Sequence, residues 1–287
     1  MAAMNLTAWS ASVVSRRSFF WLIVVLAPIL FAACSSTSGS LGQVFEGRIL
    51  QLTVIEIDRT DELRYSTPYN VAPSEVTRRW RMQPSKDELE LLLMRLKVDN
   101  HIAVNAIFVA DQQAAILRGF FQDDYRPLSV TDTVYLDARG EADATVTLGS
   151  GECFDHARMV VNAGTNVVWT NSGETASNIQ FGPGVLPEFG DNLVEIAPGA
   201  SVSHRFDRPG TFDYQCSGGE APYEAQVLVE DANSVRGEKD NNILFLEGTF
   251  ELSRDTGVDG WMVFEVPVGT KIRDLRWRAG DSITIRF

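Results

Sequence analysis

The sequence has few of the side chains that usually build catalytic or metal sites. Its 287 residues include only three cysteines and three histidines. Ser177 has no histidine and acid in an order that indicates nucleophilic catalysis. The glycine-rich turns at 182–184 and 217–220 lack phosphate-loop spacing and precede no predicted helix. We find no pattern for hydrolysis, group transfer or hydride transfer, and we predict that the protein is not an enzyme.

Positive charge is also scarce. Lys and Arg number 25 against 38 Asp and Glu, which gives a formal net charge of −13. Such an acidic chain is poorly suited to nucleic acid or to direct adhesion to anionic lipid. We therefore expect no nucleic-acid partner, and we expect any protein partner, whose identity the sequence does not give, to be basic.

The one long apolar run is too short for a good membrane-spanning helix. It extends from Phe19 to Ala33 with Pro28 inside it, whereas a spanning helix needs about 20 apolar residues. Arg16 and Arg17 precede it, so residues 1–33 have the pattern of an export signal. Residues 15–20 resemble the twin-arginine export motif, and an ordinary secretion signal is the alternative.

The end of this run resembles a bacterial lipobox. Residues 30–35 read Leu-Phe-Ala-Ala-Cys-Ser, which makes Cys34 the expected lipidated first residue of the mature protein. A signal-peptidase site with a chance cysteine is the alternative. Residues 35–40 form a polar Ser, Thr and Gly run, and residues 34–41 are predicted to be a flexible tether. We predict an exported protein that a lipid holds at the surface of the cell membrane or the outer membrane of a bacterial cell envelope.

Short strands separated by turn residues fill residues 140–231. Three segments, "AGTNVVWTN" (163–171), "APGASVSHRF" (197–206) and "RPGTFDYQC" (208–216), combine β-branched runs with Ala-Gly and Pro-Gly turns. This spacing is typical of a β-sandwich. In this order the segments resemble the cupredoxins of the plastocyanin and pseudoazurin type.

The resemblance implies a blue copper site, which needs two histidines, a cysteine thiolate and a weak axial ligand. Placed on this chain, the cysteine is Cys216, but Ser177 and Gly219 stand at the two histidine positions and Glu224 near the axial methionine. Three of the four ligands are missing. We therefore predict a cupredoxin-like domain without its blue copper site and without a cofactor, and bound copper is the alternative.

The two cysteines of the mature chain beyond Cys34 are Cys153 and Cys216. An exported protein favours their pairing, and the family topology implies that both lie at the copper end of the sandwich. A disulfide there should contribute about 2–4 kcal/mol. Two free buried thiols are one alternative. The other is a metal site of Cys216 with Cys153, His156 and Glu224, which favours Cu(I) or zinc. We interpret His156 and His204 as structural or solvated.

The residues on either side of this segment are predicted to fold together. The stretch 59–88 is expected to be loop with one short strand. The phrases "LLLMRLKVDN", "GWMVFEVP" and "DSITIRF" resemble telokin-like, immunoglobulin-type domains of bacterial surface lipoproteins. Strands are predicted at 43–58, 90–99, 103–110, 243–250, 260–267, 274–277 and 283–287, with a short helix or strand at 112–119.

The predicted fold is all-β, with two sandwiches. Residues 42–135 and 238–287 form an immunoglobulin-like sandwich, and the cupredoxin-like domain 140–231 is inserted into it. Three consecutive small units are the alternative. The predicted function is a lipid-anchored, non-enzymatic binding or structural protein. The alternatives are copper electron transfer through Cys216, and extracytoplasmic Cu(I) binding or trafficking.

Overall fold

The computed structural model describes residues 40–71, 74–121, 123–149, 153–183, 185, 193–217, 222–234 and 243–287. The predicted export signal, the lipidation residue Cys34 and Gly219 lie outside these ranges. Among the residues that are described, no helix combines the length and the apolar character needed to cross a bilayer.

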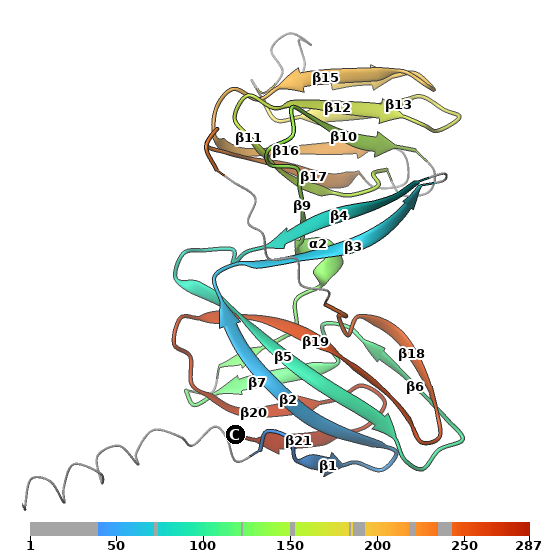
Figure 1. The fold of residues 1–287 in the computed structure, drawn as a ribbon, viewed down its shortest axis with the longest axis vertical. Coiled ribbons are helices and arrows are strands. Elements are labelled where there is room, and N and C mark those ends of the chain that lie inside the picture. The colour runs from blue at the N-terminus through green and yellow to red at the C-terminus, as the bar shows by residue number, and fades with distance from the viewer. Residues whose placement is uncertain are drawn as a thin grey trace, which may run out of the picture. The chain divides into compact units, whose positions relative to one another are not determined.

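The predicted all-β class is confirmed. The described part of the chain consists mainly of strands. The one helix within it, α2 (Val130–Thr133), is four residues long. Its first backbone groups are capped by Ser129, whose side chain accepts a hydrogen bond from the Asp132 N–H. The strands form several sheets, and Figure 1 colours them by their position along the chain, from blue to red.

Strands from both sides of residues 140–231 pair with each other. A four-stranded sheet has the order β1-β2-β5-β19, and its register runs from Thr256 opposite Asn100 to Pro267 opposite Leu89. Two further sheets have the orders β18-β6 and β21-β20-β7-β8. The bounds are β1 (Val44–Glu46), β2 (Leu50–Thr60), β5 (Leu89–Asn100), β6 (Asn105–Ala110), β7 (Ala115–Gly119), β8 (Asp124–Tyr125), β18 (Gly248–Ser253), β19 (Thr256–Pro267), β20 (Ile272–Trp277) and β21 (Ile283–Arg286).

The strand β5 is buried on both faces. Leu91 and Leu93 join a core cluster with Tyr65 and Met82, whereas Leu92 and Met94 alternate with them and are equally buried. This explains why the segment reads as a nearly continuous apolar run. The predicted strand at 90–99 is confirmed.

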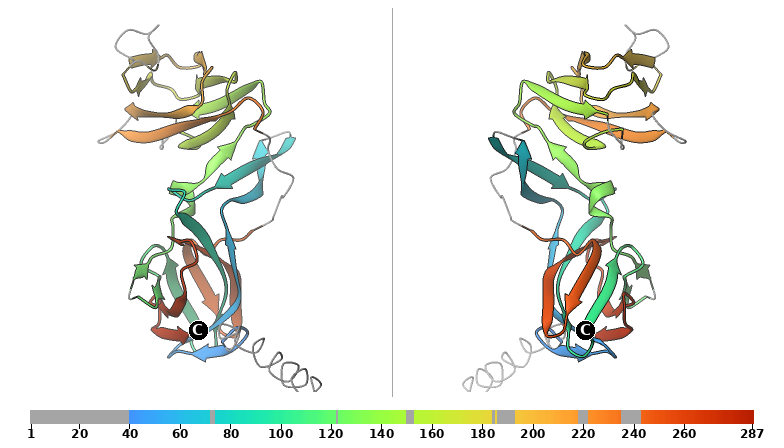
Figure 2. Two further views of the ribbon diagram at one scale, coloured as in Figure 1. Left: turned by 90° about the vertical axis from the view of Figure 1, so that its left-hand side faces the viewer. Right: turned by 90° about the vertical axis from the view of Figure 1, so that its right-hand side faces the viewer.

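The prediction for residues 59–88 is wrong. They form two nine-residue strands, β3 (Leu63–Val71) and β4 (Ser74–Met82), paired along their full length from Leu63 opposite Met82. Figures 1 and 2 show them as a cyan ribbon. β3 is the outer strand of its sheet, and an edge strand tolerates a proline such as Pro68 because one of its sides has no ladder.

Two smaller predictions also change. The strand expected at 243–250 begins later, at Gly248, where a φ of 98° marks a turn. The segment 112–119, for which helix or strand was open, contains the strand β7. The other predicted strands at 103–110, 260–267, 274–277 and 283–287 are confirmed, with ends shifted by a few residues.

Residues 135–230 form a β-sandwich with its own core. Its larger sheet has the order β14-β13-β16-β17-β11-β9-β4-β3, so the ribbon β3–β4 continues this sheet, and the smaller has the order β10-β12-β15. Between them Trp169 packs edge-on against Phe181 and Tyr214. The bounds are β9 (Tyr135–Asp137), β10 (Asp143–Leu148), β11 (Arg158–Asn162), β12 (Asn166–Asn171), β13 (Ser177–Phe181), β14 (Leu193–Ile196), β15 (Ser201–Arg205), β16 (Gly210–Ser217) and β17 (Tyr223–Glu230).

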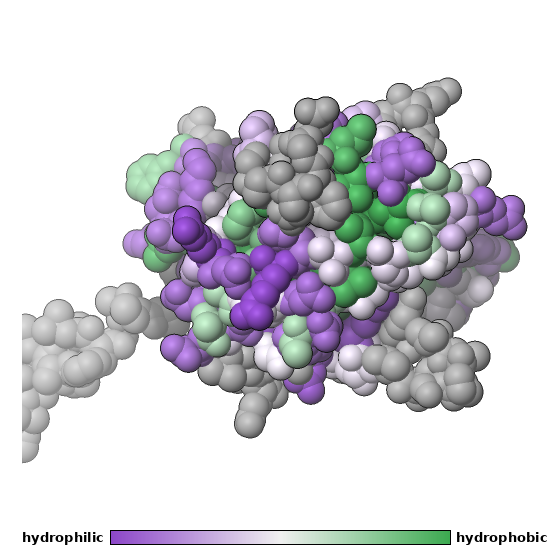
Figure 3. All heavy atoms as spheres, turned by 90° about the horizontal axis from the view of Figure 1, so that it is seen from above, coloured by the Kyte–Doolittle hydropathy of each residue, from purple (hydrophilic) through white to green (hydrophobic). Residues whose placement is uncertain are grey.

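Alternation along these strands separates core from surface. In β12, Val167, Trp169 and Asn171 are buried and the residues between them are half-buried. Seen from above in Figure 3, hydrophilic side chains cover much of the described surface, around a smaller apolar area. The three sequence segments that indicated a sandwich therefore fold as expected.

Candidate functional site

The two cysteines form a disulfide. Cys216 lies in β16, Cys153 lies ahead of β11, and their Cα atoms are 6.1 Å apart. The Cys216 side chain is fully buried, with 0% exposure. The predicted pairing is confirmed, and the alternative of two free thiols is wrong.

The other positions of the implied copper site do not assemble a donor set. Ser177 begins β13, where it pairs with Ile196, and Glu224 is an exposed residue of β17 opposite Gln215. Within the described ranges, no group of three or more His, Cys, Asp and Glu residues is placed to hold a metal. Because the sulfur of Cys216 is bonded to Cys153, it is not available as a thiolate. The residues described here do not fit a blue copper centre.

His156 lies beside the disulfide and is only 8% exposed. Its Nδ1 atom lies 2.8 Å from Oδ1 of Asp155. Both ring nitrogens are buried, and neither makes a hydrogen bond within the described residues. A buried ring nitrogen without a partner is costly unless a ligand or water satisfies it.

Asp155 is held by several donors at once. Its Oδ1 accepts the backbone N–H of Thr147 at 3.0 Å, and its Oδ2 accepts Nη2 of Arg78 at 2.6 Å. Burial by itself raises the pKa of Asp155, but the contacts with His156, Thr147 and Arg78 outweigh it and leave the pKa below its ordinary value. Asp155 is therefore a carboxylate at neutral pH.

A pocket of about 580 Å³ opens beside these residues. Tyr65 and Trp80 from the ribbon form part of its wall, and Phe154, His156 and Tyr223 line it from the cupredoxin-like domain. The remaining lining residues are Thr67, Val130, Thr131, Asp132, Val134, Cys153, Asp155, Ala157 and Glu224. We refer to it as the ribbon pocket.

The aromatic wall of the ribbon pocket is fixed by packing and hydrogen bonds. The rings of Tyr65 and Trp80 stack with centroids 6.5 Å apart, and Nε1 of Trp80 donates to Oγ1 of Thr67 at 2.7 Å. Burial, and then the carboxylate of Glu247, raise the pKa of Tyr65, so its hydroxyl stays protonated.

This wall was not predicted, because residues 59–88 were expected to form a loop. A signal was present: Leu63 and Tyr65 alternate with polar residues, as do Trp80 and Met82 in the following strand. Period-two alternation of this kind is typical of half-buried strands.

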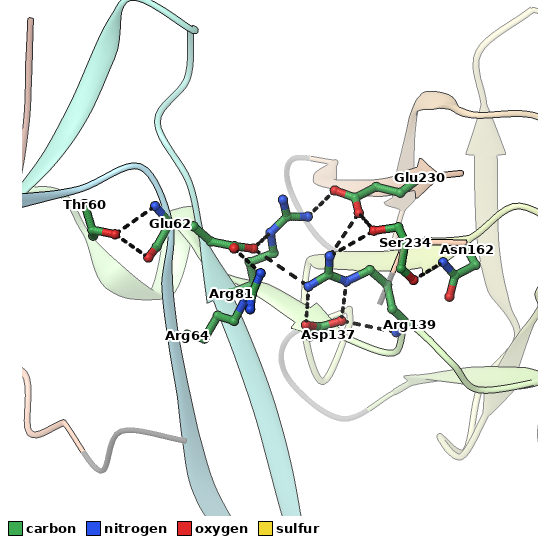
Figure 4. A network of polar contacts seen from close by, with 9 residues as sticks. All are labelled: Thr60, Glu62, Arg64, Arg81, Asp137, Arg139, Asn162, Glu230 and Ser234. Atoms are coloured by element: carbon green, nitrogen blue, oxygen red, sulfur yellow. Dashed lines mark hydrogen bonds and ion pairs between the residues drawn. The ribbon is translucent and has the colours of Figure 1, made fainter. Parts of the chain in front are cut away.

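A network of charged side chains joins the ribbon to the cupredoxin-like domain (Figure 4). Arg81 of β4 pairs with Glu62 and with Glu230 of β17. Arg139, whose side chain is only 3% exposed, donates from Nη2 to Asp137 at 2.8 Å and from Nη1 to Glu230 at 3.0 Å.

The charges in this network stabilise one another. The hydrogen bond to Asp137 raises the pKa of Arg139. Burial alone raises the pKa of Glu230, but its contacts with Ser234, Arg81 and Arg139 lower it below the ordinary value. Arg139 and Glu230 are therefore both charged at neutral pH, and the network fixes the ribbon that forms one wall of the pocket.

His204 lies in β15 and contacts the ring of Phe206, with centroids 4.8 Å apart. It is half-buried, and it does not line the ribbon pocket. This agrees with its interpretation as a structural histidine.

Several known proteins are similar to part of the chain. No family model matches the chain. Plastocyanin from Scenedesmus fuscus is 33% identical over 84 residues, which cover 26% of this chain and 85% of that protein. Among solved structures, a reduced amicyanin mutant is 23% identical with a TM-score of 0.26, covering 32% of this chain and 85% of its own. A purple cupredoxin from Nitrosopumilus maritimus is 20% identical with a TM-score of 0.24, covering 31% of this chain and 100% of its own.

Proposed function

The chain belongs to the plastocyanin family through a segment of 84 residues, and we propose that it is an exported, lipid-anchored binding protein without a blue copper centre. Its cupredoxin-like domain serves as a rigid recognition unit rather than an electron carrier. Fold alone does not establish this role. The proposal therefore depends on the residues around Cys216, where the family resemblance implies a copper site.

The disulfide between Cys153 and Cys216 is the observation that carries the proposal. A blue copper site takes its thiolate from the cysteine at this position. Here that sulfur is bonded to a second cysteine and fully buried. The bond crosslinks the end of the sandwich that a metal would otherwise organise, and it suits an oxidising compartment.

The ribbon pocket supports a binding role. Pockets of about 300–1,000 Å³ with aromatic walls and a few polar groups are the usual sites for small ligands or side chains. Its lining residues come from a single continuous sheet, from α2 and from the segment around the disulfide. No arrangement of a nucleophile with a base is found among the lining residues, which favours binding over catalysis.

The remaining parts of the proposal rest on the sequence. The lipobox at Cys34 supports a lipid anchor, and the preceding apolar run supports export. The pairing of β5 with β19 supports a discontinuous domain of residues 42–135 and 238–287 that carries the cupredoxin-like domain as an insertion. We propose an immunoglobulin-like sandwich for that domain.

Copper titration tests the central part of the proposal. The protein purified under oxidising conditions is mixed with Cu(II) and its visible absorption is recorded. We expect none of the intense colour of a Cu(II)–thiolate bond, because no thiolate is free. An intense visible band that disappears in the Cys216→Ala variant would show copper ligation and contradict the proposal.

The lipid anchor needs a separate test. In bacteria expressing the full chain, the wild type is expected in the membrane fraction, and the Cys34→Ser variant in the soluble extracytoplasmic fraction. Equal membrane association of both proteins would contradict lipidation at Cys34.

A further inference from the structure

The ribbon pocket contains a buried hydrogen-bonding atom that the described residues leave unsatisfied. His156 lines the pocket, and its Nε2 atom has no partner among them. The other ring nitrogen, Nδ1, lies 2.8 Å from the carboxylate of Asp155. Both ring nitrogens lack a hydrogen bond from the described residues, and in the neutral ring one of the two is an acceptor. The complementary ligand group is an N–H or O–H donor.

The charge of the pocket lining selects among donors. Asp132 and Glu224 both line the pocket, and neither carboxylate has a cationic partner in the described part of the chain. Asp155 adds a third carboxylate, balanced by Arg78. Two uncompensated negative charges beside a buried acceptor favour a positively charged donor.

The aromatic walls fit the same group. Trp80, Tyr65 and Tyr223 line the pocket together with Phe154. The faces of tryptophan and tyrosine attract ammonium and guanidinium groups, and tryptophan does so most strongly. A histidine acceptor, two carboxylates without an ion pair, and aromatic side chains thus favour the same ligand chemistry.

We infer that the ribbon pocket binds an organic cation, an ammonium or guanidinium group carried by a small molecule or by a basic side chain of a partner. This inference rests on the proposed binding role of the protein. It specifies the ligand class at the site, and it agrees with the acidic net charge of −13. The volume of about 580 Å³ accommodates such a group with the chain that carries it.

The test uses two probes of nearly the same shape, butylguanidinium and its neutral counterpart butylurea. Each is titrated into the oxidised protein, and binding is measured by calorimetry and by the NMR signals of the histidine rings. We expect butylguanidinium to bind at least tenfold more tightly than butylurea. We also expect it to shift the ring signals of His156 and to leave those of His204 unchanged.

Variants locate the site. Glu224→Gln keeps the shape of an exposed residue and removes one charge, so we expect butylguanidinium binding to weaken about threefold to fivefold. The matched control is Glu195→Gln, an exposed position of β14 that does not line the ribbon pocket, where no change is expected. Trp80→Leu should weaken binding about fivefold through the loss of the cation–π contact.

A second arm identifies the source of the cation. Binding of the blocked peptide acetyl-Gly-Arg-Gly-amide as tightly as butylguanidinium would assign the pocket to a basic side chain of a partner. Binding of butylguanidinium alone would assign it to a small molecule, and either result supports the inference. Equal affinity for butylguanidinium and butylurea, or binding that Glu224→Gln leaves unchanged, would overturn it. Such a failure is separable from that of the proposed function, which the copper titration tests independently.

Discussion

Replacing both Cys153 and Cys216 by alanine is expected to lower the unfolding free energy of the cupredoxin-like domain by about 4 kcal/mol. The two cysteines are 63 residues apart along the chain. Closing a loop of that length removes about 14 cal/mol/K from the entropy of the unfolded chain, or about 4 kcal/mol at room temperature. Both side chains are buried, so the lost sulfur contacts add to the effect.

Hydrogen exchange of β12 and β16 is a suitable assay, because these amides report on the cupredoxin-like core rather than on the rest of the chain. Their exchange in the double variant should indicate a free energy of opening lower by about 4 kcal/mol. Amides of β5 and β19, which pair outside this domain, are the internal control and should change little. A difference below about 1 kcal/mol in β12 and β16 would refute the argument that the bond constrains the unfolded domain.

Three further substitutions test the packing and the charges. Arg139→Met leaves the buried carboxylate of Asp137 without its arginine, so denaturant unfolding should show a loss of about 3 kcal/mol. Gly149→Ala places a Cβ 2.5 Å from the backbone nitrogen of Gly173 at a φ of 110°, and we expect a loss of about 3 kcal/mol in the same assay. The lowered pKa of Asp155 predicts stability that is full above about pH 4, its unfolded value, and lost as the pH falls through the folded pKa. Asp155→Asn should flatten that acid-side decline in a series of denaturation midpoints.

Matched variants distinguish these mechanisms from general sensitivity to substitution. Arg95→Met breaks an exposed pair with Asp259 and should leave stability nearly unchanged, unlike the loss at Arg139. Gly140→Ala also has a positive φ, but its Cβ meets no atom within 4 Å, so it should cost only about 1 kcal/mol. Equal effects within either pair, or the same acid-side slope with and without the carboxyl of Asp155, would contradict the reasoning.

The sequence predicts the parts of the fold that depend on local patterns. The β-branched run ending at Asn171 and the Pro-Gly turns at 198–199 and 209–210 place the strands of the cupredoxin-like domain correctly. The same holds for β5, where alternation outweighs the helix propensity of its Leu, Met, Arg and Lys residues. Strand propensity and period-two burial agree in these segments, so the sequence and the tertiary structure favour the same state.

The place of the ribbon in the larger sheet and the charged network were not predictable in this way. The stability of β3 depends on β4. In turn, β4 pairs with β9 of the larger sheet, where Trp80 lies opposite Leu136, a residue 56 positions further along the chain. The charged network combines Glu62 and Arg81 of the ribbon with Glu230, which is far away in the sequence, and no local pattern indicates such a grouping. The ribbon pocket was not predictable for the same reason, because the ribbon forms one of its walls.

The state of the two thiols decides whether the former copper position holds a disulfide or a metal ligand. The soluble protein beginning after Cys34, purified without reductant, is denatured and alkylated with and without prior reduction, and its intact mass is measured. We predict no added alkyl group before reduction and two after it, on Cys153 and Cys216. Two alkyl groups attached without reduction would show free thiols and contradict the disulfide on which the proposed function rests.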